Sequence, residues 1–191
     1  MFLLITPPNS VKDEAYILKQ IAAFDCCIIH VRKPNYSLEQ MTQWLDQFSS
    51  KSTQKMVLHQ QQQLYADFPI RGIHLKEFDK NGAMSLSKNS KMTFSAAFHN
   101  PVDASRQSHY HYSLLSPVFD SISKPNLKGK NFQIRKAIKP IVALGGVSDQ
   151  NIRTVRELGF HGIAVLGSVW QQKDPIKAFK TIEKTYQKVY G

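Results

Sequence analysis

The 191-residue sequence has little cysteine, few acidic residues and no long hydrophobic run. Its two cysteines, Cys26 and Cys27, are neighbours in a strand-like segment. Successive side chains of a strand point to opposite faces, so the pair cannot form an ordinary structural disulfide, and we expect buried thiols in a reducing cytoplasm. No apolar run approaches the ~20 residues that span a bilayer. The apolar start ends at Pro7 and is too short for a signal peptide, so we expect a cytoplasmic protein with no membrane association.

Acidic residues are outnumbered by basic ones: 14 Asp and Glu against 25 Lys and Arg give a net charge of +11. Such an excess indicates an anionic partner, either nucleic acid or small phosphates. The lysines are spread over predicted helices rather than clustered with exposed aromatic residues. This distribution disfavours nucleic acid and is typical of a solvated basic surface.

Short strand-like runs alternate with amphipathic segments along the whole chain, which is the pattern of a parallel sheet covered by helices. Strands are predicted over residues 2–6, 27–32, 55–59, 72–75, 91–99, 112–116, 140–144 and 162–166. Helices are predicted over residues 11–24, 37–48, 60–68, 101–108, 131–138, 148–158 and 175–190, with a loop or helical turn over 81–88. Eight such units favour a single (β/α)₈ TIM barrel of minimal length over residues 1–191, and an open doubly wound sheet is the alternative.

Glycine follows two neighbouring strands near the end of the chain. Gly145 and Gly146 come after the seventh strand, and Gly167 with Ser168 comes after the eighth. Backbone amides at these turns, with a short helix starting near Ser168, predict a phosphate site. Tight turns without a ligand are the simpler alternative.

The segment after the sixth strand, residues 117–130, combines hydroxyl groups, lysines and a glycine. Ser121, Ser123 and Lys124 could bind phosphate oxygens, and the length of the segment would permit a mobile lid. An ordinary basic surface loop explains the same composition equally well.

Four histidines lie in or at the ends of strands two to five: His30, His59, His74 and His99. Alternation places His30 and Arg32 on one face of their strand. Four imidazoles in one cavity could hold a metal, but no carboxylate accompanies them at ligand spacing, and interior histidines satisfied by hydrogen bonds are the commoner case.

Several segments, in this order, resemble the family of thiamine phosphate synthase and TenI-type thiazole tautomerase. They are IHVRK (29–33), GIHL (72–75), His99, SPVFDSISK (116–124), PIVALGGV (140–147) and GIAVLGS (162–168). The resemblance implies a (β/α)₈ barrel that binds thiazole phosphate. The synthase branch joins this to aminopyrimidine methyl diphosphate and releases pyrophosphate, whereas the tautomerase branch isomerises the thiazole precursor.

The resemblance also assigns roles to individual residues. Gly145, Gly146, Gly167 and Ser168 would hold the thiazole phosphate. Arg32, Lys33 and Lys124 would act on the pyrophosphate as catalytic residues, with Ser121 and Ser123 beside them, and His30 would contact substrate. Asp79 would bind Mg²⁺, the implied cofactor.

The sequence departs from the family pattern mainly around the diphosphate. His30 replaces a glutamine, Lys33-Pro34 replaces glutamate-lysine, His59-Gln60 replaces an asparagine-aspartate pair that supplies a magnesium ligand, and Ala97 replaces a serine. The tautomerase histidine falls at Pro117, which is a synthase-like residue. The leading interpretation is a divergent, Mg²⁺-using thiamine phosphate synthase. The alternatives are a TenI-like tautomerase with His30 or His59 as proton carrier, or a non-catalytic thiazole-phosphate-binding regulator, and a homo-oligomer is left open.

Overall fold

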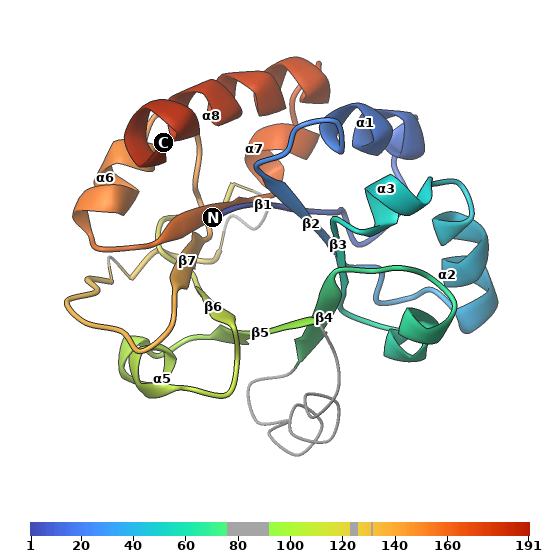
Figure 1. Ribbon diagram of the computed structural model, residues 1–191. Helices are drawn as coiled ribbons and strands as arrows, with labels where there is room; N and C mark the ends of the chain where they lie inside the picture. Colours follow the sequence, from blue (N-terminus) through green and yellow to red (C-terminus); the bar gives the residue numbers. More distant parts are fainter. Residues whose placement is uncertain (76–91, 123–125, 131) are drawn as a thin grey trace.

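Eight parallel strands close into a barrel in the order β1 to β8, as Figure 1 shows in a computed structural model that describes residues 1–75, 92–122, 126–130 and 132–191. The strands are β1 (Phe2–Ile5), β2 (Cys27–Val31), β3 (Met56–Leu58), β4 (Gly72–Leu75), β5 (Thr93–Phe98), β6 (Tyr112–Leu115), β7 (Ile141–Leu144) and β8 (Gly162–Val165). β1 pairs with β8 as well as with β2, so the sheet is closed and the open doubly wound alternative is excluded.

Helices surround the barrel (Figure 1). They are α1 (Glu14–Ile21), α2 (Leu38–Leu45), α3 (Ser50–Thr53), the 3₁₀ helix η1 (Gln62–Ala66), α5 (Pro101–Arg106), α6 (Ile152–Glu157), α7 (Gly167–Trp170) and α8 (Pro175–Tyr190). The predicted capping box of α2 is present, because the Ser37 side chain accepts from the Gln40 amide and the Gln40 side chain accepts from the Ser37 amide. Helix α8 has the predicted bounds.

The helix predicted over residues 131–138 is wrong for the described residues 132–138, which are irregular. Their amides bond to other parts of the chain: Ile134 donates to the Leu158 carbonyl and Ile138 to the Ser105 carbonyl. Ile134 also packs closely against Gly159, where an added β-carbon would lie 2.0 Å from the Ile134 carbonyl oxygen. Tertiary hydrogen bonds have replaced the intrahelical ones that the local pattern indicated.

The side chains of each strand divide between two cores. Outward-facing residues such as Ile29 and Val31 pack against the helices in one large cluster. Inward-facing residues fill the barrel in a second, smaller cluster of Leu3, Ile5, Ile28, Val57, Tyr112, Leu114, Val142 and Ala164. Cys26 and Cys27 are free thiols, as expected, although only Cys27 is fully buried. This parity decides which predicted residues can reach the barrel interior.

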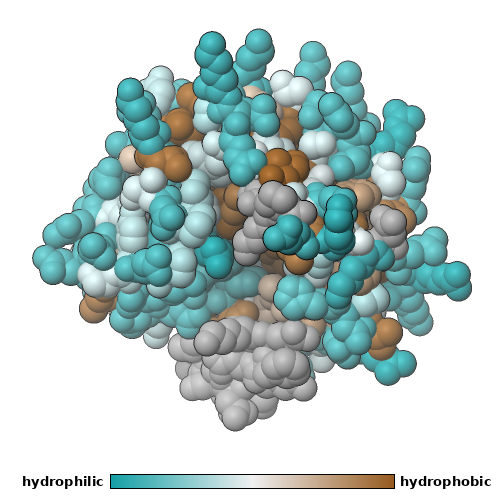
Figure 2. Space-filling view, turned by 180° about the vertical axis from the view of Figure 1, so that it is seen from behind, coloured by the Kyte–Doolittle hydropathy of each residue, from teal (hydrophilic) through white to brown (hydrophobic). Residues whose placement is uncertain are grey.

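The surface seen from behind is mainly hydrophilic, with hydrophobic residues in separate small patches (Figure 2). Among the described residues, no helix is both long and apolar enough to cross a membrane.

Candidate functional site

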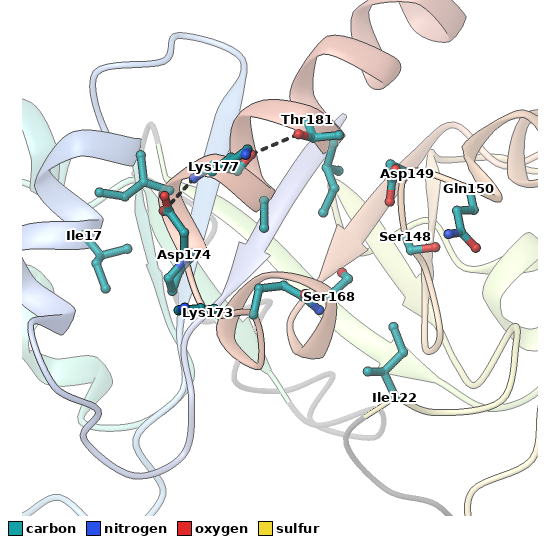
Figure 3. A pocket seen from close by; sticks show the side chains of 15 residues that line it. Ile17, Ile122, Ser148, Asp149, Gln150, Ser168, Lys173, Asp174, Lys177 and Thr181 are labelled. Atoms are coloured by element: carbon teal, nitrogen blue, oxygen red, sulfur yellow. Dashed lines mark hydrogen bonds between the residues drawn. The ribbon is translucent and has the colours of Figure 1, made fainter.

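A pocket of about 950 Å³ lies at the carboxyl ends of β7 and β8 (Figure 3). Its walls come from the β7–α6 turn, the α7–α8 linker and the first half of α8, with one residue each from α1, α7 and the loop after β6 (residues 116–130, the β6 loop). Among the lining residues are Ile17, Ser148, Ser168, Lys173, Asp174 and Lys177. Asp174 caps α8 by accepting the Lys177 amide at 2.9 Å, so this wall is fixed by the helix terminus.

Ser168 stands in the middle of this pocket wall, between the β7–α6 turn and α8 (Figure 3). The residue is 7% exposed, and its hydroxyl oxygen is the one buried side-chain polar atom of the described residues without a hydrogen-bond partner. Helix α7 is anchored beside it, because the Trp170 indole N–H donates to the Ile5 carbonyl at 2.9 Å. An unpartnered buried hydroxyl is costly, and a ligand oxygen would satisfy it.

Gly145 and Gly146 connect β7 to this pocket with positive φ angles of 100° and 67°. A β-carbon on Gly146 would lie 2.3 Å from the Asp120 carbonyl oxygen, and one on Gly145 would lie 3.0 Å from the Pro117 α-carbon. The space beside both glycines is therefore filled by the β6 loop. Both positions need glycine because the β6 loop packs against them. Phosphate binding by their backbone amides stays a prediction.

The β6 loop is tied down along its described length. The amides of Val118 and Phe119 donate to the carbonyls of Leu144 and Gly145, and the Ser121 amide donates to Leu127. Asp120 accepts from the Gly129 amide at 2.8 Å and the Lys128 ammonium at 2.9 Å. Both bonds lower the pKa of the Asp120 carboxyl, the Gly129 bond more strongly. Ser121 thus lies on a loop that is held by hydrogen bonds, whereas Ser123 and Lys124 lie outside the described residues.

Three of the four singled-out histidines converge inside the barrel. His30 Nδ1 is 3.0 Å from His59 Nε2, and the His59 and His74 rings stack with centroids 4.1 Å apart. His99 does not join them, because it follows the end of β5 and its Nδ1–H donates to the Ser116 carbonyl. His30 has no exposed surface and His74 is 8% exposed, whereas His59 is only partly buried, so the cluster reaches from the interior toward the mouth.

Two hydroxyl groups that the sequence analysis did not single out complete this cluster. His30 Nε2 lies 2.7 Å from the Tyr112 hydroxyl, and His74 Nδ1 lies 2.9 Å from Ser95 Oγ. The barrel register places Ser95 beside both His74 and Tyr112. Inward parity on β5 and β6 was the signal that could have identified them.

The three imidazoles are held in their neutral form. Burial lowers the pKa of His30 well below its ordinary value, and His74 adds a smaller repulsion. Burial also lowers the pKa of His59, with further contributions from His74, His30 and Arg32. Burial alone lowers the pKa of His74 to about 4. The contribution of Arg32 is the smallest of these, and its expected role at the pyrophosphate stays a prediction.

Lys33 does not have the surroundings expected of a catalytic residue. It faces the helices, has no exposed surface, and donates to both carboxylate oxygens of Glu14 and to the Asn9 carbonyl. Those three acceptors use all three ammonium hydrogens. We therefore correct the expected contact with pyrophosphate: in this structure the Lys33 ammonium is buried in an ion pair.

After β3, where the family carries a magnesium ligand, this chain offers no carboxylate. Mg²⁺ prefers carboxylate oxygens, but the family's ligand position after β3 carries Gln60, whose side-chain oxygen accepts the Lys33 amide at 3.0 Å. Its neighbour His59 offers nitrogen, a poor ligand for this ion. Asp79, the other expected ligand, lies outside the described residues.

The fold and this arrangement define a (β/α)₈-barrel protein with a polar pocket after its last two strands. The family described as thiamine monophosphate synthase matches residues 2–169, so the chain belongs to that family.

Curated relatives named thiamine-phosphate synthase match parts of the chain. The Psychrobacter sp. (strain PRwf-1) protein is 33% identical over 85 residues, which is 38% of this chain and 40% of the relative. The Vibrio parahaemolyticus protein is 27% identical over 124 residues, which is 56% of this chain and 57% of the relative. The matches thus span about half the length of these relatives.

Solved structures agree in fold. Thiamine phosphate pyrophosphorylase from Pyrococcus furiosus superposes with a TM-score of 0.76 at 18% identity, covering 100% of this chain and 96% of that one. The enzyme of the same name from Bacteroides thetaiotaomicron gives 0.74 at 22% identity, covering 97% of both chains. These likenesses confirm the barrel.

Proposed function

We propose that this chain is a cytoplasmic transferase of thiamine biosynthesis, a divergent thiamine phosphate synthase acting on small phosphates. It would join aminopyrimidine methyl diphosphate to thiazole phosphate and release pyrophosphate. The observation that carries this proposal is the Ser168 hydroxyl, which is buried and unpartnered in a pocket at the position that the resemblance assigns to thiazole phosphate. Family membership supports the reaction class.

The roles of the chain's own residues follow from their positions. Ser168 would donate its hydroxyl hydrogen to a phosphate oxygen, assisted by the first amides of α7, which have no acceptor within the helix. Loss of pyrophosphate leaves a cation on the pyrimidine and develops negative charge on the leaving group. Arg32, which directly follows β2, would stabilise that negative charge, with Ser121, Ser123 and Lys124 assigned beside it by resemblance.

The test combines the two substrates with purified protein and Mg²⁺ and measures thiamine phosphate. We expect product from the parent chain and from Ser108→Ala, an exposed serine before β6 that serves as control. Ser168→Ala should raise the dissociation constant for thiazole phosphate by about tenfold, as expected for one hydrogen bond to a charged group. Absence of product from folded parent protein would refute the synthase activity.

A TenI-like isomerase is the second candidate, favoured by the hydrogen bond between His30 and His59. A neutral imidazole that is partly exposed, as His59 is, could carry a proton to and from a bound thiazole. Isomerisation of the thiazole precursor by the parent, and its loss in His59→Gln, would support this candidate. Thiazole phosphate binding with neither activity would identify a regulator.

A further inference from the structure

The three histidines inside the barrel form a group whose side-chain nitrogens converge. One ligand atom from each of His30, His59 and His74 lies within 4.8 Å of the other two. Among the described residues, this is the one set of three or more His, Cys, Asp or Glu side chains with such an arrangement. Barrel interiors are usually filled by branched apolar residues, so three adjacent imidazoles require a separate explanation.

The hydrogen bonds of the cluster leave suitable nitrogens facing one another. With His30 Nε2 bonded to Tyr112 and His74 Nδ1 bonded to Ser95, the second nitrogens, His30 Nδ1 and His74 Nε2, remain for a metal. His30 Nδ1 would exchange its hydrogen bond to His59 Nε2 for the metal. Metal-binding histidines characteristically have the outer ring nitrogen held by a protein group in this way. His59 Nε2, already 3.0 Å from His30 Nδ1, supplies the third nitrogen.

The spacing is close to that of a bound metal. Zn–N distances of about 2.0–2.1 Å in a tetrahedral site put ligand nitrogens roughly 3.3 Å apart. The His30–His59 separation of 3.0 Å is near this value, and the widest separation of at most 4.8 Å needs a closure of about 1.5 Å. His59 directly follows β3 and is partly exposed, so its side chain has more freedom to adjust than those of His30 and His74.

We propose that His30, His59 and His74 bind a divalent transition metal ion, with Zn²⁺ as the leading candidate. Imidazole nitrogen suits Zn²⁺, Co²⁺, Ni²⁺ and Cu²⁺, whereas Mg²⁺ and Ca²⁺ prefer oxygen. Three histidines leave a fourth position for water or an anionic ligand oxygen, and His59 places that position toward the mouth of the barrel. The three imidazoles support this metal site whether or not the chain is a transferase, although the resemblance also assigns His30 to substrate contact.

The test uses full-length protein freed of metal by a chelator and titrated with Co²⁺, whose visible absorption reports nitrogen coordination, followed by displacement with Zn²⁺. We expect about one ion per chain. His59→Gln should weaken binding at least 100-fold, because it removes a ligand. Tyr112→Phe should weaken it about 10- to 100-fold, because it removes the partner that orients His30. His109→Gln, which changes an exposed histidine at the opposite end of the barrel, should bind as the parent does.

Absence of Co²⁺ binding by the parent, or equal affinity in parent and His59→Gln, would overturn the proposal. Circular dichroism establishes that each variant is folded. If His59→Gln does not fold, Ser95→Ala takes its place, since it frees His74 from its hydrogen bond and should weaken Co²⁺ binding while leaving His59 intact. Because no thiamine precursor is present, the result is separate from success or failure of the synthase assay.

Discussion

The Lys33 ammonium contacts both carboxylate oxygens of Glu14, at 2.6 and 2.8 Å, in a pair with 0% and 5% exposed side-chain surface. Burial raises the pKa of the Glu14 carboxyl, and the bond to Lys33 opposes this shift. Burial likewise lowers the pKa of the Lys33 ammonium, and Glu14 opposes it. Each charge is therefore tolerable between β2 and α1 only because the other is there.

Replacing Lys33 alone should be strongly destabilising. Lys33→Met leaves the Glu14 carboxylate buried without its partner, and we expect a loss of about 3–5 kcal/mol in the free energy of unfolding by urea. The double variant Lys33→Met with Glu14→Leu removes both charges and should recover most of that loss. Thiazole phosphate affinity equal to the parent's in the folded double variant is the result expected of a structural lysine. A large drop in thiazole phosphate affinity in the folded double variant would instead show that Lys33 takes part in anion binding.

Gly146 should not tolerate a side chain. Alanine at its φ of 67° costs about 1–2 kcal/mol, and the added β-carbon would also press on the Asp120 carbonyl oxygen at 2.3 Å. We expect Gly146→Ala to lower the free energy of unfolding by about 2 kcal/mol or more and to displace the β6 loop. A change below about 0.5 kcal/mol would contradict both the backbone cost at this φ and the contact with the Asp120 carbonyl oxygen.

Strand periodicity predicted the barrel and placed His30 on the opposite face of its strand from Ile29 and Val31, because parity is a local property. The same parity places Lys33 with Val31 on the helix face. The family resemblance assigned Lys33 to the pyrophosphate site, although strand alternation indicated the helix-facing side. The local sequence pattern predicted α8 correctly. It failed for residues 132–138, where backbone amides donate to carbonyls far away in the sequence. Other contacts depend on how neighbouring strands are aligned, which the sequence of one strand does not specify. Examples are the bond from His99 to Ser116 and the contacts of Tyr112 and Ser95 with the histidines.

The β6 loop contact should depend on pH. The pKa of Asp120 is lowered, first by the Gly129 amide and then by Lys128, so its contribution is present above the ordinary aspartate pKa. It is lost as the pH falls through the lowered folded value. Hydrogen exchange of the Gly129 amide should therefore lose protection in acid. Asp120→Ala should show the unprotected behaviour at neutral pH, whereas Lys128→Met, which keeps the 2.8 Å bond from Gly129, should stay protected. Protection in Asp120→Ala equal to the parent's would contradict this account.

Zinc should stabilise the folded chain if the three histidines bind it. An ion that binds only the folded state at 100 times its dissociation constant adds about 2.7 kcal/mol. The melting temperature of chelator-treated protein should therefore rise when Zn²⁺ is added and fall again with excess chelator. His109→Gln should respond as the parent does, and His59→Gln should not respond, because it lacks one of the three converging nitrogens. An equal rise in all three proteins would mean that Zn²⁺ acts at another place on the chain.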